Sequence, residues 1–346
     1  MITEHIVITD RLENTFNSFF QSVAYSDVGV LVDENTLQHC YPLIYDFLPD
    51  HHLIQIQSGE IHKNLNICSH IWQKMTDAGF DRKALLVNVG GGVIGDMGGF
   101  CAATYKRGID FINIPTTLLA QVDAAVGGKL GIDFQGFKNH IGLFKDPLKV
   151  IISPVFLNTL SKRELRSGFA EVIKHSLIAD RNYWPNIVHH PFEKQDWPSH
   201  ITHSVNIKSE VVSKDFKEGG LRKVLNFGHT IGHAVESYFL NTPSPLLHGE
   251  AIAMGMLSEV YLSQKYCQMP ENEASQIERF LLDVYGHVDL EDIQIKEIAR
   301  LAIQDKKNER GAIQCALLRE IGQAVYDVKV GVDDIEEALN HYKNKG

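Results

Sequence analysis

Hydrophobic residues in the first half of the chain gather in short runs. The runs occupy residues 28–33, 53–56, 85–89, 111–114 and 149–152, and segments long enough for a helix separate them. Apolar runs that alternate with helical segments are typical of a parallel sheet covered by helices on both faces. The pattern predicts an α/β domain of the nucleotide-binding type over residues 1–155.

The spacing of apolar residues changes after Pro154, where the strand-like runs stop. Long mixed segments follow at residues 161–180, 199–217, 226–240 and 247–267, and they carry apolar residues at helical spacing. Such a stripe forms the buried face of an amphipathic helix. We therefore expect a mainly α-helical second domain over residues 156–346.

Composition and charge limit the classes of function. The 346 residues are 44% hydrophobic, which suffices for two cores. With 33 basic against 43 acidic residues the formal net charge is −10, so we expect no nucleic-acid partner. No segment approaches the roughly 18 apolar residues of a membrane span, and the N-terminal residues lack the apolar run of a signal peptide. These features predict a cytoplasmic protein that binds no membrane.

The cysteines are scattered without CxxC spacing, at Cys40, Cys68, Cys101, Cys267 and Cys315. Cysteines in a chain without an export signal are usually reduced. We expect them to be small apolar core residues.

A glycine-rich segment follows the run at 85–89 directly. Residues 90–95 read GGGVIG, which has the GxGxxG spacing between a strand and a predicted helix. Such glycines let the backbone approach a pyrophosphate at a helix N-terminus, although a glycine-rich packing turn fits the same spacing. The acidic residue usual about 20 positions later is here Asp110, which would open the next strand. Asp33 and Glu60, each following an earlier run, are better placed for a ribose contact.

Histidines and a glutamate in the second half suggest a metal site. His229 and His233 lie four residues apart, on one face of a predicted helix. His248 opens another apolar helix, and Glu171 lies within a third, where an unpaired carboxylate is costly. One glutamate and two histidines from three helices would form an open catalytic zinc site, whereas ordinary helix histidines would need no metal. The segment lacks the glutamate of HExxH, which disfavours metalloprotease chemistry.

Two lysines stand beside glycines between residues 123 and 139. Lys129 follows Gly127-Gly128, and Lys138 with Asn139 follows Gly136. A lysine next to exposed backbone amides suits a phosphate group, although a lone GGK is often a surface turn. The combination favours a small anionic substrate.

The blocks GGGVIGD, PTTLLAQVD, VGGK, KN, SGFAEVIKH, LNFGHTIGH and HGEAIAMGM occur along the chain in this order. In these blocks and their order the chain resembles a known family, the 3-dehydroquinate synthases, which are sugar phosphate cyclases. The resemblance covers about residues 28 to 325 and separates the chain from the metal-dependent glycerol dehydrogenases of the same architecture. It implies an α/β NAD-binding domain followed by a mainly helical metal- and substrate-binding domain.

The resemblance implies a carbon-oxygen lyase that converts 3-deoxy-arabino-heptulosonate 7-phosphate into 3-dehydroquinate and phosphate. The reaction would proceed by transient oxidation by NAD, phosphate elimination, re-reduction and an intramolecular aldol closure. It would be a step of the shikimate pathway to chorismate and the aromatic amino acids. The alternatives are a cyclase acting on sedoheptulose 7-phosphate, a metal-dependent polyol dehydrogenase that releases NADH, and a catalytically silent zinc-stabilised binding protein. The lysine-rich phosphate set disfavours the dehydrogenase, and the complete set of polar site residues disfavours the silent protein.

The resemblance also implies the roles of individual residues. The ligands of zinc, or of cobalt in its place, would be Glu171, His229 and His248. The NAD contacts would be Asp33, Asn35, Glu60, Lys63, Gly91, Gly92, Val93, Asp96, Thr116, Thr117, Lys129, Lys138, Phe156, Leu157, Asn158 and Thr159. The substrate contacts would be Asp123, Lys129, Asn139, Lys174, Lys208, Arg222, Asn226 and His233, together with Lys306 or Lys307. Arg107 would reach the site of a neighbouring subunit, which implies a homodimer.

The chain departs from the family pattern at two places. The serine common after the aspartate of the VD motif is replaced at Ala124 or Ala125, and the threonine usual after GGK is Leu130. Neither change removes a charge, so we expect the implied chemistry to be retained.

Overall fold

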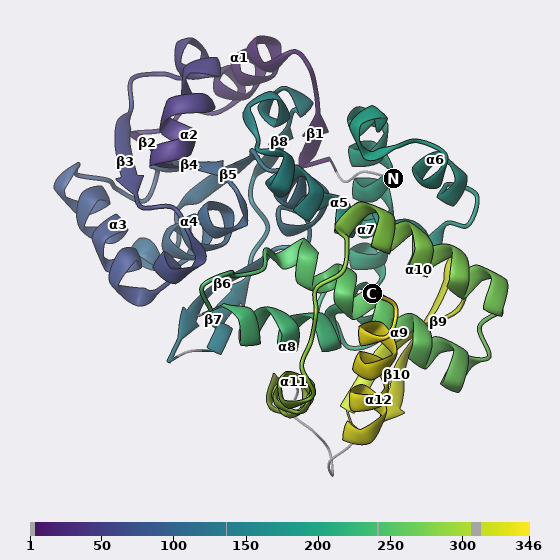
Figure 1. Cartoon of the computed structure of the whole chain (residues 1–346). Helices are drawn as coiled ribbons and strands as arrows, with labels where there is room; N and C mark the ends of the chain where they lie inside the picture. Colours follow the sequence, from purple (N-terminus) through teal and green to yellow (C-terminus); the bar gives the residue numbers. More distant parts are fainter. Residues whose placement is uncertain (1–3, 136, 241, 306–312) are drawn as a thin grey trace. The chain divides into compact units, whose positions relative to one another are not determined.

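The predicted parallel sheet forms the centre of the N-terminal half. The computed structural model describes residues 4–135, 137–240, 242–305 and 313–346. Six strands there pair in parallel in the order β1, β8, β5, β4, β2, β3 (Figure 1). Their bounds are β1 (Ile6–Ile8), β2 (Val28–Asp33), β3 (His52–Ile56), β4 (Leu85–Gly90), β5 (Asp110–Pro115) and β8 (Lys149–Ile152). The five runs predicted as strands are confirmed, and β1 adds an edge strand.

Helices cover both faces of this sheet. They are α1 (Leu12–Ser22), α2 (Glu34–His39), α3 (Leu65–Asp77) and α4 (Gly92–Thr104). Leu31 and Leu86 pack with residues of α3 and α4, whereas Val30 and Val87 pack with residues of α1 and α2. Successive side chains of a strand point to opposite faces, so a doubly covered sheet needs continuous apolar strands. This is why the strands were recognisable in the sequence.

The strand order reverses between β2 and β4. Strand β2 pairs with β3 on one side and with β4 on the other, and the chain then continues outward through β5 and β8. The carboxyl ends of the strands at such a reversal border the crevice in which open α/β sheets bind ligands. Asp33 ends β2, and the glycine-rich segment follows β4. Asp110 opens β5, as expected.

A smaller antiparallel sheet carries the candidate phosphate lysines. It consists of β6 (Lys129–Phe134) and β7 (Phe137–Phe144). Leu130 and Ile132 of β6 belong to the core that includes α4, which anchors the hairpin. Short helical turns occur at η1 (Tyr41–Leu43), η2 (Tyr45–Phe47), η3 (Glu60–His62), η4 (Tyr105–Arg107), η5 (Ala120–Ala124), η6 (Pro154–Thr159), η7 (Phe192–Lys194) and η8 (Leu221–Asn226).

The chain divides into two units. The first comprises Met1–Ser161 and Trp197–Ser209, and the second comprises Lys162–Asp196 and Glu210–Gly346. The helix α7 (Trp197–Lys214) contributes residues to both. The other helices of the second unit are α5 (Lys162–Ala179), α6 (Trp184–Val188), α8 (His229–Phe239), α9 (His248–Cys267), α10 (Glu271–Tyr285), α11 (Asp292–Asp305) and α12 (Val332–Lys343). The predicted helical segments correspond to α5, α7, α8 and α9.

The expectation that strands stop after Pro154 is wrong near the C-terminus. Strands β9 (Ile313–Glu320) and β10 (Gln323–Val330) form an antiparallel hairpin. Cys315, Ala316, Leu317 and Leu318 are all buried, so β9 lacks the alternation of a half-exposed strand. A short apolar run of this kind cannot be told from a buried helical turn by its periodicity.

Glycines allow α8 and α9 to approach closely. A β-carbon on Gly232 would lie 2.8 Å from Ile252 Cδ1 and 3.1 Å from the carbonyl oxygen of Ala251. Side chains at the crossing would therefore separate the helices. The crossing matters because His229 begins α8 and His248 begins α9.

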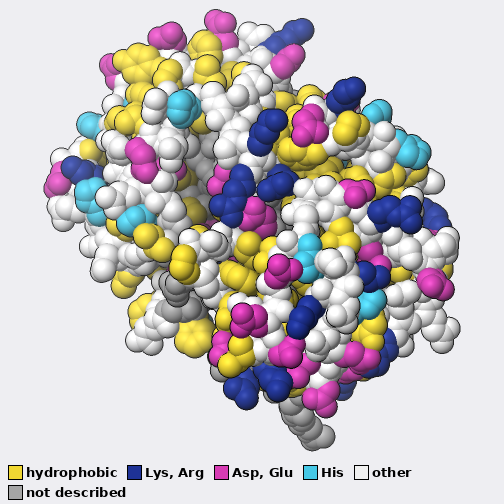
Figure 2. Space-filling model, viewed as in Figure 1, with side chains coloured by type: hydrophobic (Ala, Val, Ile, Leu, Met, Phe, Trp, Pro, Cys, Tyr) yellow, Lys and Arg dark blue, Asp and Glu magenta, His cyan; other side chains and the backbone are white. Residues whose placement is uncertain are grey.

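Other expectations concern the surface and the cysteines. No helix within the described ranges is long and apolar enough to cross a membrane. On the face drawn in Figure 2, Lys and Arg side chains are interspersed with Asp and Glu. All five cysteines are thiols, of which Cys267 is half-buried and the other four are buried.

Candidate active site

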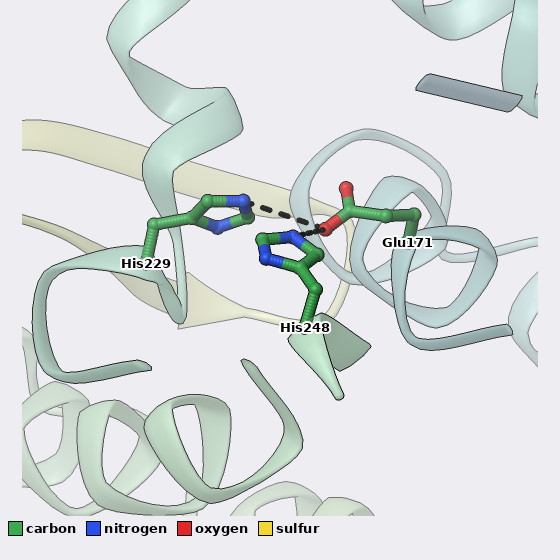
Figure 3. A group of neighbouring side chains, drawn as sticks. All are labelled: Glu171, His229 and His248. Carbon is green, nitrogen blue, oxygen red and sulfur yellow. Dashed lines mark ion pairs between the residues drawn. The ribbon is translucent and has the colours of Figure 1, made fainter. Parts of the chain in front are cut away.

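Glu171, His229 and His248 converge in the second unit (Figure 3). They come from α5, α8 and α9, the three helices expected from the sequence. Glu171 Oε1 lies 3.4 Å from His229 Nε2 and 3.6 Å from His248 Nε2. Each residue can offer one ligand atom, and these atoms lie within 4.8 Å of one another.

The second nitrogen of each imidazole faces an oxygen acceptor. His229 Nδ1 lies 3.1 Å from the carbonyl oxygen of Phe227, and His248 Nδ1 lies 3.4 Å from Glu236 Oε2. An Nδ1–H bond to such an acceptor fixes the ring and leaves the Nε2 lone pair for a metal. Both rings thus have the surroundings that metal-binding histidines usually have.

Electrostatics at the two histidines differ. Burial lowers the pKa of His229 well below its usual value, and the Lys174 ammonium lowers this pKa further. Burial also lowers the pKa of His248, but hydrogen bonds to Glu171 and Glu236 outweigh burial and raise this pKa to about 10. A cation bound at Nε2 would displace the proton from His248.

The residues fit a divalent metal of the zinc type. Glu171 is fully buried, and it forms an ion pair with Lys174, one helical turn later. One carboxylate and two imidazoles are the donor set of an open catalytic zinc centre, in which substrate or water completes the coordination. Placing a carboxylate in this buried position is costly unless cations surround it. The donor chemistry and the orientation of the rings therefore support a metal centre here.

In the first unit, Lys63 links residues predicted to contact NAD and substrate. Its Nζ lies 2.7 Å from Asp96 Oδ2 and 2.6 Å from Asn139 Oδ1. Burial lowers the pKa of Lys63, but the carboxylates of Asp96 and Glu60 outweigh burial and raise it. Burial raises the pKa of Asp96 against the opposing effect of Lys63. Lys138 Nζ lies 3.8 Å from Glu60 Oε1. Lysines and carboxylates therefore alternate around Lys63.

The glycine-rich turn fits a pyrophosphate. Gly91 is the N-cap residue of α4, and a β-carbon on it would lie 3.2 Å from Thr117 Cγ2. A β-carbon on Gly92 would lie 3.3 Å from Ala124 Cβ. Side chains at these positions would narrow the depression lined by residues 90–92, Gly95 and Asp96. Backbone amides at a helix N-terminus are a ready anion site, so the turn can hold the diphosphate of a dinucleotide.

The remaining residues of the predicted NAD set have varied surroundings. Asp33 Oδ1 accepts the Thr36 N–H at 2.7 Å and so caps α2, which is a structural role of its own. Thr117 Oγ1 accepts the Ala120 N–H at 3.1 Å. Phe156 and Leu157 are buried, and Phe156 belongs to the core beside α1. Exposed members of the set are Asn35, Lys129, Asn158 and Thr159.

Lys208 and Asp123, both predicted substrate contacts, are paired within the first unit. Lys208 Nζ lies 2.6 Å from Asp123 Oδ1, and it also donates to the Asp123 carbonyl oxygen at 2.6 Å. Lys208 is largely buried. Its ammonium is thereby held in one position rather than free to move as on a solvated helix.

Arg222 and Asn226 both belong to the short helix η8 of the second unit. Arg222 is buried and donates through Nη1 to the Phe216 carbonyl oxygen at 2.6 Å. Asn226 Nδ2 donates to Glu218 Oε1 at 2.7 Å. His233 lies one turn after His229, with ring centroids 5.1 Å apart. Asn226 thus ends η8 three residues before α8 begins, and His233 lies within α8.

Family models match the chain over two adjacent segments. One is described as 3-dehydroquinate synthase N-terminal and matches residues 53–167. The other is described as 3-dehydroquinate synthase C-terminal and matches residues 168–308. The chain belongs to the 3-dehydroquinate synthase family.

Individual relatives agree with this assignment. The chain is 40% identical over 348 residues to a 3-dehydroquinate synthase of Parabacteroides distasonis, covering 99% of each chain. It is 40% identical over 299 residues to one of Leptospira interrogans, covering 85% of this chain and 81% of that one. Among solved structures, it is similar to 2-epi-5-epi-valiolone synthase from Streptomyces hygroscopicus with NAD+ and Zn2+ bound. That likeness has 25% identity and a TM-score of 0.86, and it covers 100% of this chain and 98% of the other.

The predicted contacts that remain are Arg107 and either Lys306 or Lys307. Lys306 and Lys307 lie outside the described residues. Arg107 is exposed, and its φ of +73° follows a Lys106 φ of +48°.

Sequence reasoning missed several carboxylates that contact these residues. Glu236 faces His248, and Glu218 accepts from Asn226. Asp215 accepts the N–H groups of Gly219, Gly220 and Arg222. An aspartate shortly before two glycines is a turn signal that could have revealed Asp215. For Glu236, the only signal in the sequence was its position seven residues after His229 on the same predicted helix.

Proposed function

We propose that this chain is a 3-dehydroquinate synthase, a lyase that converts 3-deoxy-arabino-heptulosonate 7-phosphate into 3-dehydroquinate and phosphate. The observation that carries the proposal is the convergence of Glu171, His229 and His248 in a chain so similar to named 3-dehydroquinate synthases. The reaction is a step of the shikimate pathway, which leads to chorismate and the aromatic amino acids.

NAD and a divalent metal, zinc or cobalt, are the proposed cofactors. When bound, NAD accepts and returns a hydride while the metal acidifies hydroxyl groups of the substrate. Glu171, His229 and His248 hold the metal, and the backbone of Gly91 and Gly92 receives the NAD pyrophosphate. Asp33 ends β2 and Glu60 follows β3, at the edge of the sheet where ribose contacts are made in sheets of this type.

Cationic and amide side chains recognise the substrate's anionic groups. Lys129 and Asn139 serve the phosphate. Arg222 receives the carboxylate, because a buried guanidinium binds such a group at two points. Lys174, one helical turn from Glu171, donates a hydrogen bond to a substrate oxygen near the metal. A sugar phosphate without a carboxylate would leave Arg222 without its proposed ligand group.

A coupled assay tests the reaction. Purified protein is incubated with zinc, substoichiometric NAD and 3-deoxy-arabino-heptulosonate 7-phosphate, and phosphate, 3-dehydroquinate and NADH are followed together. We expect equal amounts of phosphate and dehydroquinate, with no accumulation of NADH. Conversion of the added NAD into accumulating NADH without phosphate release would instead identify a dehydrogenase. If the protein does not convert 3-deoxy-arabino-heptulosonate 7-phosphate but does turn over sedoheptulose 7-phosphate, it is another sugar phosphate cyclase.

Matched histidine variants test the metal assignment. His248→Ala should lower the zinc content and abolish turnover. His341 is a suitable control, because its Nε2 also pairs with a glutamate, Glu278, at 2.9 Å. His341→Ala should keep the zinc content and most of the activity. Full activity of a zinc-free His248→Ala protein would refute the assignment.

The proposal includes a cytoplasmic homodimer in which Arg107 serves the neighbouring subunit's site. Arg107→Ala and Glu171→Ala should each inactivate the enzyme. Mixed dimers of the two variants would contain one site with neither defect, so activity should return on mixing. Absence of recovery in verified mixed dimers would show that Arg107 acts within its own subunit. Cell fractionation tests the cytoplasmic location.

A further inference from the structure

The helix that carries His229 begins without a cap from its own sequence. Its N-cap residue is Gly228, with φ +80° and, within the described chain, no side-chain cap bond. A β-carbon on Gly228 would lie 2.5 Å from Met256 Cγ and 3.2 Å from the carbonyl oxygen of Ile252. The close packing of α9 therefore excludes Ser, Thr or Asp, the usual capping residues, at this position.

Glu259 of α9 makes the missing contacts from the neighbouring helix. Its Oε2 accepts the Gly228 N–H at 2.6 Å, and its Oε1 accepts the Ile231 N–H at 3.2 Å. These amides belong to the N-cap and third helical positions, which a capping box satisfies with two side chains of the helix itself. Here one carboxylate serves both amides.

Glu259 is buried and held in place. Its exposed fraction is 0%. Ser263 Oγ donates to the Glu259 carbonyl oxygen at 2.6 Å and accepts the Leu318 N–H of β9 at 2.9 Å, which ties this turn of α9 to the hairpin. Removing a carboxylate from water is costly, and a positive helix N-terminus offsets that cost. A methionine would fill similar space without the cost, which indicates that the carboxylate does more than pack.

We propose that Glu259 is a positioning residue for the metal ligand His229. It fixes the backbone at Gly228 and Ile231, which bracket His229 in the chain. With this start of α8 fixed, His229 Nε2 stands 3.4 Å from Glu171 Oε1. The inference rests on the proposed metal site, and it concerns how the ligand is held rather than which residues are ligands.

Glu259→Gln tests the proposal, because the amide keeps the volume but replaces one acceptor oxygen by a donor. Glu273→Gln is the matched control: Glu273 is 6% exposed, and its Oε2 accepts the Ile321 N–H at 2.7 Å. We expect Glu259→Gln to weaken zinc binding about tenfold or more in chelator competition and to alter the visible spectrum of bound Co2+. Glu273→Gln should lose stability yet keep both metal properties. Unchanged affinity and spectrum in Glu259→Gln, or an equal loss in Glu273→Gln, would overturn the proposal.

A measurement on the unchanged protein covers the case in which Glu259→Gln does not fold. Coupling between two sites is reciprocal. If the contact between Glu259 and the two amides strengthens zinc binding by a given factor, bound zinc should strengthen that contact by the same factor. Zinc should therefore slow hydrogen exchange at Gly228 and Ile231 more than at Ile321. Equal slowing at all three would also refute the proposal. An unchanged protein that binds no zinc would refute the metal site itself, which separates the two failures.

Discussion

Gly255 of α9 lies directly against Gly228 at the start of α8. A β-carbon on Gly255 would stand 2.0 Å from the Gly228 carbonyl oxygen and 2.6 Å from the Gly232 nitrogen. Backbone rather than a flexible side chain occupies that space, so a side chain cannot be accommodated without moving a helix. The same crossing brings His229 and His248 to ring centroids 5.5 Å apart. The placement of these two proposed metal ligands thus depends on a glycine, which has no side chain.

Gly255→Ala should destabilise the protein and weaken its metal site together. Overpacking of this kind typically costs about 1–3 kcal/mol of unfolding free energy. Urea unfolding and zinc affinity measure the two effects. Gly219→Ala is the control, because a β-carbon there has its nearest neighbour at 3.9 Å. Normal zinc affinity in Gly255→Ala would show that the helices separate without disturbing the ligands.

Glu236→Gln should weaken metal binding. The amide of the new side chain would keep the contact with His248 Nδ1 but would lack the negative charge that strengthens the hydrogen bond from Nδ1–H. The loss of such a partner behind a metal-binding histidine usually costs about 10- to 100-fold in metal affinity. Chelator competition with zinc measures the effect. Glu278→Gln alters another Glu–His pair, with His341, and should leave zinc affinity intact. Similar losses in the two variants would mean that the effect arises from general destabilisation.

Lys63→Met should destabilise the first unit and weaken NAD binding. Lys63 is 3% exposed, and its removal would leave the Asp96 carboxylate without its ammonium. Breaking a buried pair typically costs about 3–5 kcal/mol, so the addition of Asp96→Asn should restore part of the unfolding free energy. Lys214→Met, which removes an exposed pair with Glu210, should change it by no more than about 1 kcal/mol. A Lys63→Met protein as stable as this control would contradict the prediction.

Asp215 should titrate below the usual range of an aspartate. Backbone N–H bonds from Gly220, Arg222 and Gly219 lower its pKa from the ordinary 3.8. Because the folded-state pKa is depressed, the carboxylate's contribution to stability is complete above pH 3.8 and is lost as the pH falls through the lowered value. NMR titration of the Asp215 carboxyl measures this pKa directly. A value at or above 3.8 would show that the three amides do not hold the ionised form.

Asp215→Ala should raise the KM for substrate more than it lowers zinc affinity. Its carboxylate fixes the turn that leads to Arg222, whereas the metal ligands come from α5, α8 and α9. Steady-state kinetics and chelator competition on the same preparation compare the two effects. Loss of zinc without a change in KM would place the turn in the metal site instead.

Apolar runs in the sequence were enough to predict the parallel sheet, and residue types were enough to suggest the ligand set of the proposed metal centre. Strands buried on both faces are mainly apolar, so β2, β4 and β5 were visible as runs, even though β4 and β5 each contain a buried asparagine, Asn88 and Asn113. The glycine-rich turn was visible because few other residues allow the backbone such close approach. Glu171, His229 and His248 were visible because carboxylates and imidazoles are conspicuous beside apolar helical residues.

The groups that hold those residues in place come from distant segments and became visible only in the folded chain. Glu259 reaches Gly228 across 31 positions, and Lys63 reaches Asn139 across 76. Local periodicity carries no record of such pairings, because they depend on how helices and strands cross. The hairpin of β9 and β10 was hidden for a related reason, since burial against α9 removes the alternation that marks an exposed strand. Residue types therefore reveal the chemistry, while packing between distant segments sets its geometry.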